Sequence, residues 1–177
     1  NVMRAKFEKI LTPISQTVLL NELAGQVDFQ PWFINVLMHE LAHGLGPQGV
    51  NKTLKERHSA LEEAKADVTG LHNLTVLAER GVYTPDFVRK AYIAHLGDLF
   101  RATRFGTSEA HGKANLIQFN WFMEKGSLKS QDKNQQGRYD RLLAGSKKQA
   151  TADQASLPQL AKEAEKATQG QADVALG

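Results

Sequence analysis

Hydrophobic residues along the chain recur mainly at the three- and four-residue spacing that marks one face of an α-helix. Alternation with a period of two, which marks a half-buried strand, never continues long enough to predict one. The segments with helical spacing cover residues 3–24, 31–43, 54–80, 85–100 and 108–125. The pattern therefore predicts a mainly α fold.

Proline, glycine and a capping hydroxyl mark the ends of these segments. Pro13 interrupts the first segment, and Gly25 closes it. Thr84 precedes a proline, and this pair is typical of an N-cap followed by the first position of a helix. Gly81 and Gly126 follow the third and fifth segments as stop signals. These signals predict separate helices joined by short connections.

The composition changes from Ser127 onward. Lys, Gln, Ala, Ser, Asp and Gly dominate there, and aromatic residues almost disappear. Residues 150–167 have only a weak amphipathic pattern, so a mobile or poorly packed segment is favoured over a stable helix. We therefore predict a helical domain over residues 1–126 and a polar, weakly helical or mobile tail over residues 127–177.

Charge and composition exclude several classes of protein. Lys and Arg number 22 against 19 Asp and Glu, which is too small an excess to indicate nucleic-acid binding. No cysteine is present for a disulfide or a thiolate metal site. No signal peptide or membrane-length apolar run is visible, so we expect a soluble protein without a membrane partner, with cytoplasm favoured over periplasm. The chain starts without methionine inside an expected helix, as a fragment or a processed product would.

One short motif carries recognisable chemistry. His39 and His43 are four residues apart, and Glu40 directly follows the first histidine. On a helix, positions i and i+4 lie on one face, so both imidazoles can bind one metal ion while Glu40 acts on a water molecule. The alternative for the motif alone is a surface helix with two unrelated histidines.

A third metal ligand is expected from the next helical segment, because a catalytic zinc site has three protein ligands and one open position. Glu63 and Asp67 again have i, i+4 spacing. We assign Glu63 as the ligand and Asp67 as the carboxylate that supports a ligand histidine. Glu62 points to another side of the helix and is expected to accept a hydrogen bond from the other histidine. The alternative is an ordinary solvated acidic face.

These motifs resemble those of known enzymes. His-Glu-x-x-His followed by Glu-x-x-x-Asp resembles the gluzincin class of zinc metallopeptidases. The longer strings MHELAHGLGP (38–47) and SALEEAKADV (59–68) resemble, more narrowly, bacterial members of the dipeptidyl-peptidase III family. The best-known members carry one extra residue before the second histidine, so the chain resembles a branch with the shorter motif. The similarity extends from about residue 3 to about residue 126.

The resemblance implies a helical, zinc-binding catalytic domain that removes dipeptides from the N-termini of peptides. Such enzymes bind the peptide between two lobes, and this sequence contains no candidate for the substrate-binding strand of the other lobe. A second lobe or a partner chain is therefore implied. The resemblance also implies that His111, within an Ala-His segment, stabilises the transition state. The alternative for His111 is a structural or capping role.

The expected cofactor is one zinc ion, held by His39, His43 and Glu63, although cobalt and manganese suit the same ligands. Glu40 would take the proton of the attacking water and pass it to the leaving amine. Two other classes remain open. One is a non-catalytic zinc-binding domain or metal-bearing fragment of a larger enzyme, and the other is a zinc hydrolase of small amides or esters.

Overall fold

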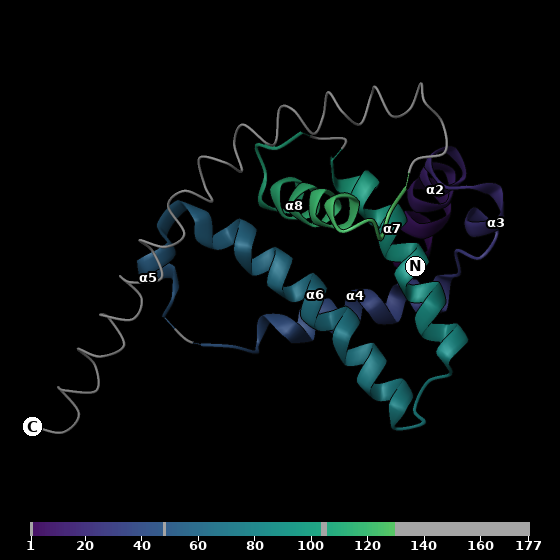
Figure 1. The fold of residues 1–177 in the computed structure, drawn as a ribbon, viewed down its shortest axis with the longest axis horizontal. Helices are drawn as coiled ribbons and strands as arrows, with labels where there is room; N and C mark the ends of the chain where they lie inside the picture. The colour runs from purple at the N-terminus through teal and green to yellow at the C-terminus, as the bar shows by residue number, and fades with distance from the viewer. Residues whose placement is uncertain (1, 48, 104–105, 130–177) are drawn as a thin grey trace, which may run out of the picture. The chain divides into compact units, whose positions relative to one another are not determined.

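The computed structural model describes residues 2–47, 49–103 and 106–129, and within these ranges it contains helices and no strands. The mainly α prediction is therefore confirmed. No helix in these ranges has both the length and the apolar character needed to cross a membrane. Figure 1 shows the helices, which are α1 (Val2–Lys6), η1 (Phe7–Leu11), α2 (Thr12–Val18), α3 (Asn21–Ala24), α4 (Phe29–His43), α5 (Asn51–Leu54), η2 (Lys55–Arg57), α6 (His58–Glu79), α7 (Pro85–Thr103) and α8 (Ala110–Glu124).

The chain divides into two compact units. Of the described residues, the first unit comprises those within 1–46 and 59–119, and the second comprises those within 47–58 and 120–129. All residues singled out in the sequence for metal binding or catalysis belong to the first unit. The predicted tail over residues 127–177 lies outside the described residues, apart from 127–129. The boundary between a domain at 1–126 and this tail remains a prediction.

The first helical segment bends around Pro13 without breaking there. Pro13 lies in the first turn of α2, directly after the π-helical turn η1. Proline cannot donate a backbone hydrogen bond, and the wider π turn accommodates that missing bond. The helix ends only at Leu19, whose backbone is extended.

The ends of the other long helices follow the sequence signals closely. α4 begins at Phe29, two residues before Pro31, because the Asp28 side chain accepts a hydrogen bond from the Gln30 backbone at 3.3 Å. Thr84 caps α7 by accepting from the Phe87 backbone at 3.1 Å. A glycine with positive φ follows the ends of α6 and α8, as expected for helix termination.

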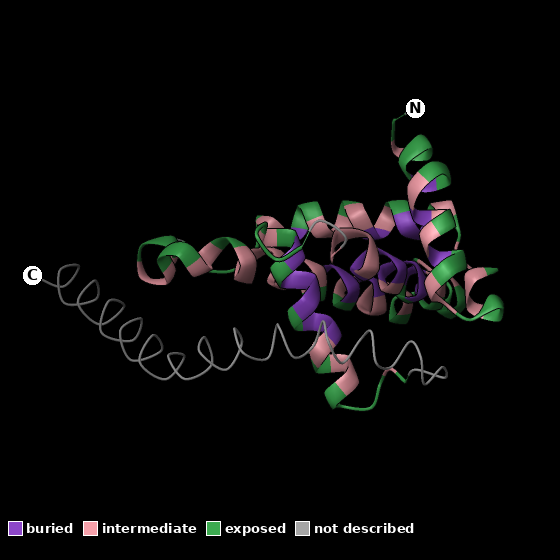
Figure 2. Ribbon diagram, turned by 90° about the horizontal axis from the view of Figure 1, so that it is seen from above, coloured by how far each residue is buried: buried purple, intermediate pink, exposed green. Residues whose placement is uncertain are grey.

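Two buried clusters hold the first unit together. Phe7, Leu11, Trp32 and Ala94 join η1, α4 and α7, while Leu74, Val88 and Ala91 join α6 and α7. Figure 2 shows the buried positions on the sides of helices that face other helices. Trp32 also donates its indole N–H to the buried Asp98 carboxylate at 2.6 Å. Together these contacts fix α4, the helix with the histidine pair, against α7.

The buried face of α7 differs from the apolar stripe that its sequence predicts, which comprises Phe87, Val88, Tyr92, Leu96, Leu99 and Phe100. Tyr92 belongs to that stripe but is 43% exposed, whereas Ala91, Ala94 and Gly97 are buried. A Cβ atom on Gly97 would lie 2.4 Å from the Ser15 hydroxyl oxygen. The buried side of α7 is therefore the side whose small residues let neighbouring helices approach closely. The pattern of hydrophobic residues alone does not identify this side.

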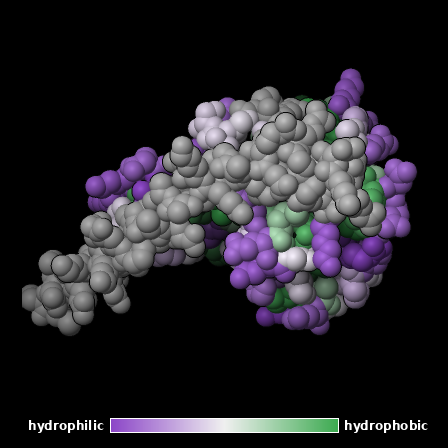
Figure 3. Space-filling view, turned by 45° about the horizontal axis from the view of Figure 1, so that its top comes forward, coloured by the Kyte–Doolittle hydropathy of each residue, from purple (hydrophilic) through white to green (hydrophobic). Residues whose placement is uncertain are grey.

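One side of α4 keeps large hydrophobic residues at the surface. They recur every four positions along the helix and just beyond it and are between 37% and 57% exposed: Phe33, Leu37, Leu41 and Leu45. Such spacing places them in a single row, which we call the α4 apolar row. Figure 3 shows, on the face it presents, hydrophobic residues interspersed with hydrophilic ones. Phe33 stacks on Phe29, and the four side chains nevertheless keep between 37% and 57% of their surface exposed among the described residues.

Gly70 of α6 allows that helix to approach α4 at the first histidine of the motif. A Cβ atom at this position would lie 3.0 Å from the His39 backbone nitrogen and 3.1 Å from the Met38 carbonyl carbon. These are backbone atoms of a packed helix and cannot move aside as a flexible side chain would. The absent side chain therefore sets the separation of the two helices that carry the motifs.

We expect Gly70→Ala to destabilise the protein by about 1–3 kcal/mol, the usual cost of overpacking. In a helix without such a close contact, alanine would be more stable than glycine by up to about 1 kcal/mol. A net loss of stability in Gly70→Ala would therefore come from the close approach of the two helices. Denaturant unfolding measures the change, with Gly25→Ala as the control because its added Cβ meets no atom closer than 3.4 Å. Unchanged stability of Gly70→Ala would contradict the tight packing.

Candidate metal centre

The two helices bring three potential ligand atoms together. On α4, the Nε2 atoms of His39 and His43 are 3.1 Å apart. The Glu63 Oε2 atom of α6 lies 3.2 Å from the first and 3.6 Å from the second. Ligand atoms around a tetrahedral zinc ion are separated by roughly 3.3–3.5 Å, given metal–ligand bonds of about 2.0–2.2 Å. The three atoms thus have the spacing of one face of such a tetrahedron.

The other ring nitrogen of each histidine is held by a carboxylate. His39 Nδ1 donates to Asp67 Oδ1 at 2.7 Å, and His43 Nδ1 donates to Glu62 Oε1 at 3.1 Å. A carboxylate can only accept, so both Nδ1 atoms carry the hydrogen. In the neutral rings, the two Nε2 atoms therefore face each other as acceptors. This arrangement is the usual one for histidines that bind a metal.

The Glu63 carboxylate adds a third acceptor to the same small space. Its Oε2 atom is buried and has no hydrogen-bond partner, although three histidine Nε2 atoms lie within 3.6 Å of it. A buried acceptor without a donor costs free energy, and three acceptors that face one another repel. A cation among them removes both penalties. The residues present therefore fit a bound divalent metal ion.

Two supporting carboxylates have lowered pKa values. Burial raises the pKa of Asp67, but the hydrogen bonds from His39 and Gln118 and the nearby His95 outweigh it, so the net pKa is lowered. The pKa of Glu62 is lowered chiefly by a hydrogen bond from Lys65, which approaches it to 2.6 Å. The hydrogen bond to Asp67 in turn raises the pKa of His39. Both carboxylates are thus kept charged opposite the histidines.

His111, at the start of α8, also reaches this group. Its Nε2 atom lies 3.1 Å from Glu63 Oε2, and its ring stacks on that of His39 at 6.2 Å between centroids. His39, Glu63 and His111 could therefore also hold a metal ion among themselves. Unlike the α4 histidines, His111 is 62% exposed, and no carboxylate among the described residues holds its second ring nitrogen. We therefore favour His43 as the ligand and place His111 on the wall of the adjoining cavity.

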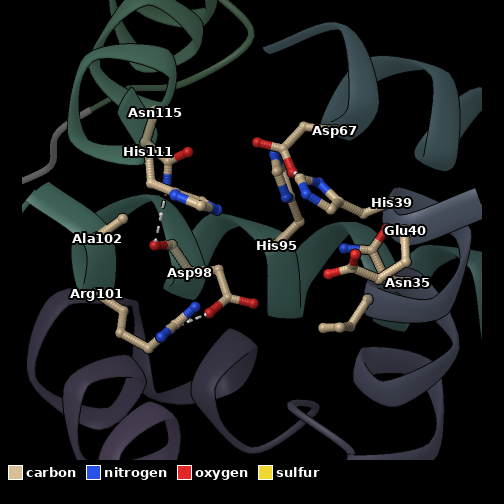
Figure 4. Close-up of a pocket in the computed structure, with 11 residues that line it drawn as sticks. Asn35, His39, Glu40, Asp67, His95, Asp98, Arg101, Ala102, His111 and Asn115 are labelled. Carbon is tan, nitrogen blue, oxygen red and sulfur yellow. Dashed lines mark hydrogen bonds and ion pairs between the residues drawn. The ribbon is translucent and has the colours of Figure 1, made fainter. Parts of the chain in front are cut away.

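A cavity opens beside the metal centre. Figure 4 shows His39, Glu40 and Asn35 on one side of it and His111, Asn115 and Arg101 on the other. Glu40 lines the cavity from α4, and its side chain is exposed. This placement leaves its carboxylate free to act on a molecule in the cavity.

A buried pair behind Asp67 has no counterpart in the sequence motifs. Gln118 of α8 donates to Asp67 Oδ2 at 2.7 Å, and its side-chain oxygen accepts from His95 Nε2 of α7 at 3.1 Å. The sequence gives His95 no partner spacing, which indicates an ordinary surface or helix-packing residue, and the structure buries it at 4% exposure. Neither Gln118 nor His95 has a sequence spacing that relates it to the metal-binding motifs. Their contact with Asp67 is visible only in the folded structure. Three helices thus orient His39.

We expect Asp67→Asn to weaken zinc binding about 10- to 100-fold, the usual cost of losing a supporting carboxylate behind a ligand histidine. The substitution preserves the shape of the side chain and removes its charge. Competition with a chromophoric chelator measures the affinity. Asp86→Asn is the control, because Asp86 is exposed and, among the described residues, pairs with Arg89 and Lys90 alone. Equal affinities of the two variants would exclude a supporting role for Asp67.

No family model matches the chain, but two solved structures are similar to it. The dipeptidyl-peptidase III of Caldithrix abyssi has a TM-score of 0.71 and 37% identity, and the match covers 92% of this chain and 35% of that structure. The dipeptidyl-peptidase III of Corallococcus sp. strain EGB has a TM-score of 0.69 and 40% identity, covering 73% of this chain and 26% of that structure. The resemblance to dipeptidyl-peptidase III is therefore confirmed in both sequence and fold.

A curated relative has a different name. The chain is 43% identical to Nudix hydrolase 3 of Arabidopsis thaliana over 138 residues, which are 72% of this chain and 18% of that protein. The match covers only 18% of that protein, so its name describes a chain of which most is not matched. The two similar structures, in contrast, are both dipeptidyl-peptidase III enzymes. The chain thus has a peptidase-related fold, and it spans about a third or less of these relatives.

Proposed function

We propose that this relative of the dipeptidyl-peptidase III enzymes carries the catalytic zinc centre of a metallopeptidase. The observation that carries the proposal is the triangle of acceptor atoms from His39, His43 and Glu63, in which a buried carboxylate oxygen lacks a donor. Their separations suit zinc, and their types suit a catalytic site with three protein ligands. Asp67 and Glu62 would hold the two histidines in the binding tautomer.

A bound zinc ion would supply a positive charge that polarises the scissile carbonyl and acidifies a water molecule. Glu40, free on the cavity wall, would accept the proton of that water and deliver it to the leaving amine. His111 would donate a hydrogen bond to the oxygen that becomes negatively charged. Its exposure and its place on the cavity wall support this role, because a molecule in the cavity can reach its imidazole.

The proposed substrate is an unblocked peptide, from which dipeptides would be released. The names of the two similar structures support this choice. Because the chain spans 35% and 26% of those structures, we further propose that a second lobe or partner chain completes the peptide-binding surface. The α4 apolar row supports such a partner, because four large hydrophobic side chains on one line are usually covered in a complete protein.

Product mapping tests the proposal. Zinc-loaded chain is incubated with a mixture of unblocked peptides and with the same peptides acetylated at the N-terminus, and the products are identified by mass spectrometry. Dipeptides from the unblocked set alone would support dipeptide release. Cleavage of both sets, or of simple amides and esters, would indicate another zinc hydrolase. One zinc ion per chain without cleavage would identify a metal-bearing part of a larger enzyme, and absence of zinc binding would refute the proposal.

A further inference from the structure

The cavity beside the metal centre is also lined by residues that the proposed chemistry does not use. Asn35 lies one turn before His39 on α4, and Asn115 lies one turn after His111 on α8. Residues four apart share a helix face. Asn35 therefore lies on the same face of α4 as His39, and Asn115 lies on the same face of α8 as His111. Arg101 of α7 lines the same space (Figure 4). We call Asn35, Arg101 and Asn115 the polar chamber.

Asn35 is the least expected of the three. It is only 5% exposed, yet its carboxamide has no hydrogen-bond partner within the described part of the chain. The carboxamide atoms of Asn35 are not among the fully buried unpaired atoms of the described residues, so they retain some surface toward the cavity. Because Asn35 lines the cavity, a molecule bound there can supply the missing hydrogen bonds.

The other two members have hydrogen-bonding groups to spare. Asn115 uses its NH₂ group to donate to the Asp98 backbone oxygen at 3.2 Å, which leaves its amide oxygen as an acceptor. Arg101 donates through Nε to the Asp98 carboxylate, and its side chain is 34% exposed. A guanidinium has four further N–H groups. The chamber therefore offers both donors and acceptors to a ligand.

The charge of Arg101 in the cavity is already balanced by a neighbouring carboxylate. Asp98 compensates the charge of Arg101, and its second oxygen accepts from Trp32. Glu40, on the same wall as Asn35, adds a negative charge. An amide ligand can donate to the oxygen of the Asn35 carboxamide and accept from its NH₂ group, whereas a carboxylate can only accept.

We propose that the polar chamber binds a main-chain amide of the peptide substrate, next to the scissile bond. This inference rests on the proposed function, because it places the peptide against Glu40 and the zinc ligands. The hydrogen bonds of Asn35 would fix the position of the chain beside the metal, which is how binding groups reduce the cost of orienting a substrate. Asn35 is thus a substrate-binding residue that the motifs do not include.

The test uses the full chain with Glu40→Gln, loaded with zinc, so that a bound peptide is not consumed. Tetra-alanine is titrated in, and the side-chain NH₂ signals of Asn35 are followed by NMR. We expect saturable shifts, and Asn35→Leu should weaken binding at least tenfold while zinc remains at one ion per chain. The control is Asn73→Leu, a partly buried position of α6 that does not line the cavity.

Three results would overturn the inference: peptide binding unaffected by Asn35→Leu, no saturable shift of the Asn35 signals, or the same shift with acetate as with peptide. The shift is measured with Asn35 in place, so the test survives even if the leucine variant folds poorly. Loss of zinc binding in the parent chain would instead refute the proposed function, so the two failures are distinguishable.

Discussion

Replacing Glu63 by alanine is expected to weaken zinc binding by at least about a hundredfold. Structural zinc in zinc-finger peptides binds with apparent free energies of roughly 10–16 kcal/mol. On that scale, one of three protein ligands carries on the order of a third of the binding free energy, at 1.4 kcal/mol for each factor of ten. Glu63 Oε2 is the atom nearest all three histidines. Its loss also removes the only proposed ligand that does not belong to α4.

The same substitution makes a second prediction about the metal-free protein. Because Glu63 Oε2 is buried without a donor, the metal-free chain should be no less stable with alanine at this position. Zinc affinity is measured by chelator competition and stability by denaturant unfolding without metal. Glu79→Ala, at the exposed end of the same helix, is the control. A strong loss of metal-free stability would show that Glu63 is a structural residue instead.

The sequence predicted the helices well because the signals for them are local. Periodicity, the Thr84 cap and the glycines after α6 and α8 each act within a few residues of a helix end. The histidine pair is likewise a property of one helix. In the structure Asp67 contacts His39 and Glu62 contacts His43. The i, i+4 spacing on α6 relates Asp67 to Glu63, and the role of each carboxylate at a metal stays a prediction.

Groups that act through contacts between helices could not be predicted. Gln118 and His95 lie on different helices, and nothing in the spacing of α7 or α8 relates either one to Asp67. Asn35 resembles any polar residue in an amphipathic helix until its burial is known. Gly70 likewise becomes informative only when the His39 backbone is seen against it. Local signals predict where each helix begins and ends along the chain. They do not predict how closely two helices pack against each other.

Glu40→Gln is expected to abolish turnover by the zinc-loaded protein while leaving one zinc ion bound per chain. A carboxylate that transfers a proton contributes about 10²- to 10⁴-fold to the rate, and glutamine keeps its size without accepting that proton. Zinc should remain because the Glu40 side chain is exposed on the cavity wall, and the metal-facing atoms come from His39, His43 and Glu63.

Comparing this variant with Glu63→Ala separates proton transfer from metal binding. Both should lose peptide hydrolysis, but only Glu63→Ala should also lose zinc, and added zinc should restore none of the activity of Glu40→Gln. Steady-state rates on an unblocked peptide, with metal content measured on the same samples, provide the comparison. Turnover by zinc-loaded Glu40→Gln at the rate of the unmodified protein would remove Glu40 from the mechanism. The metal centre would then need a different base, and His111, 3.1 Å from Glu63, is the nearest histidine outside α4.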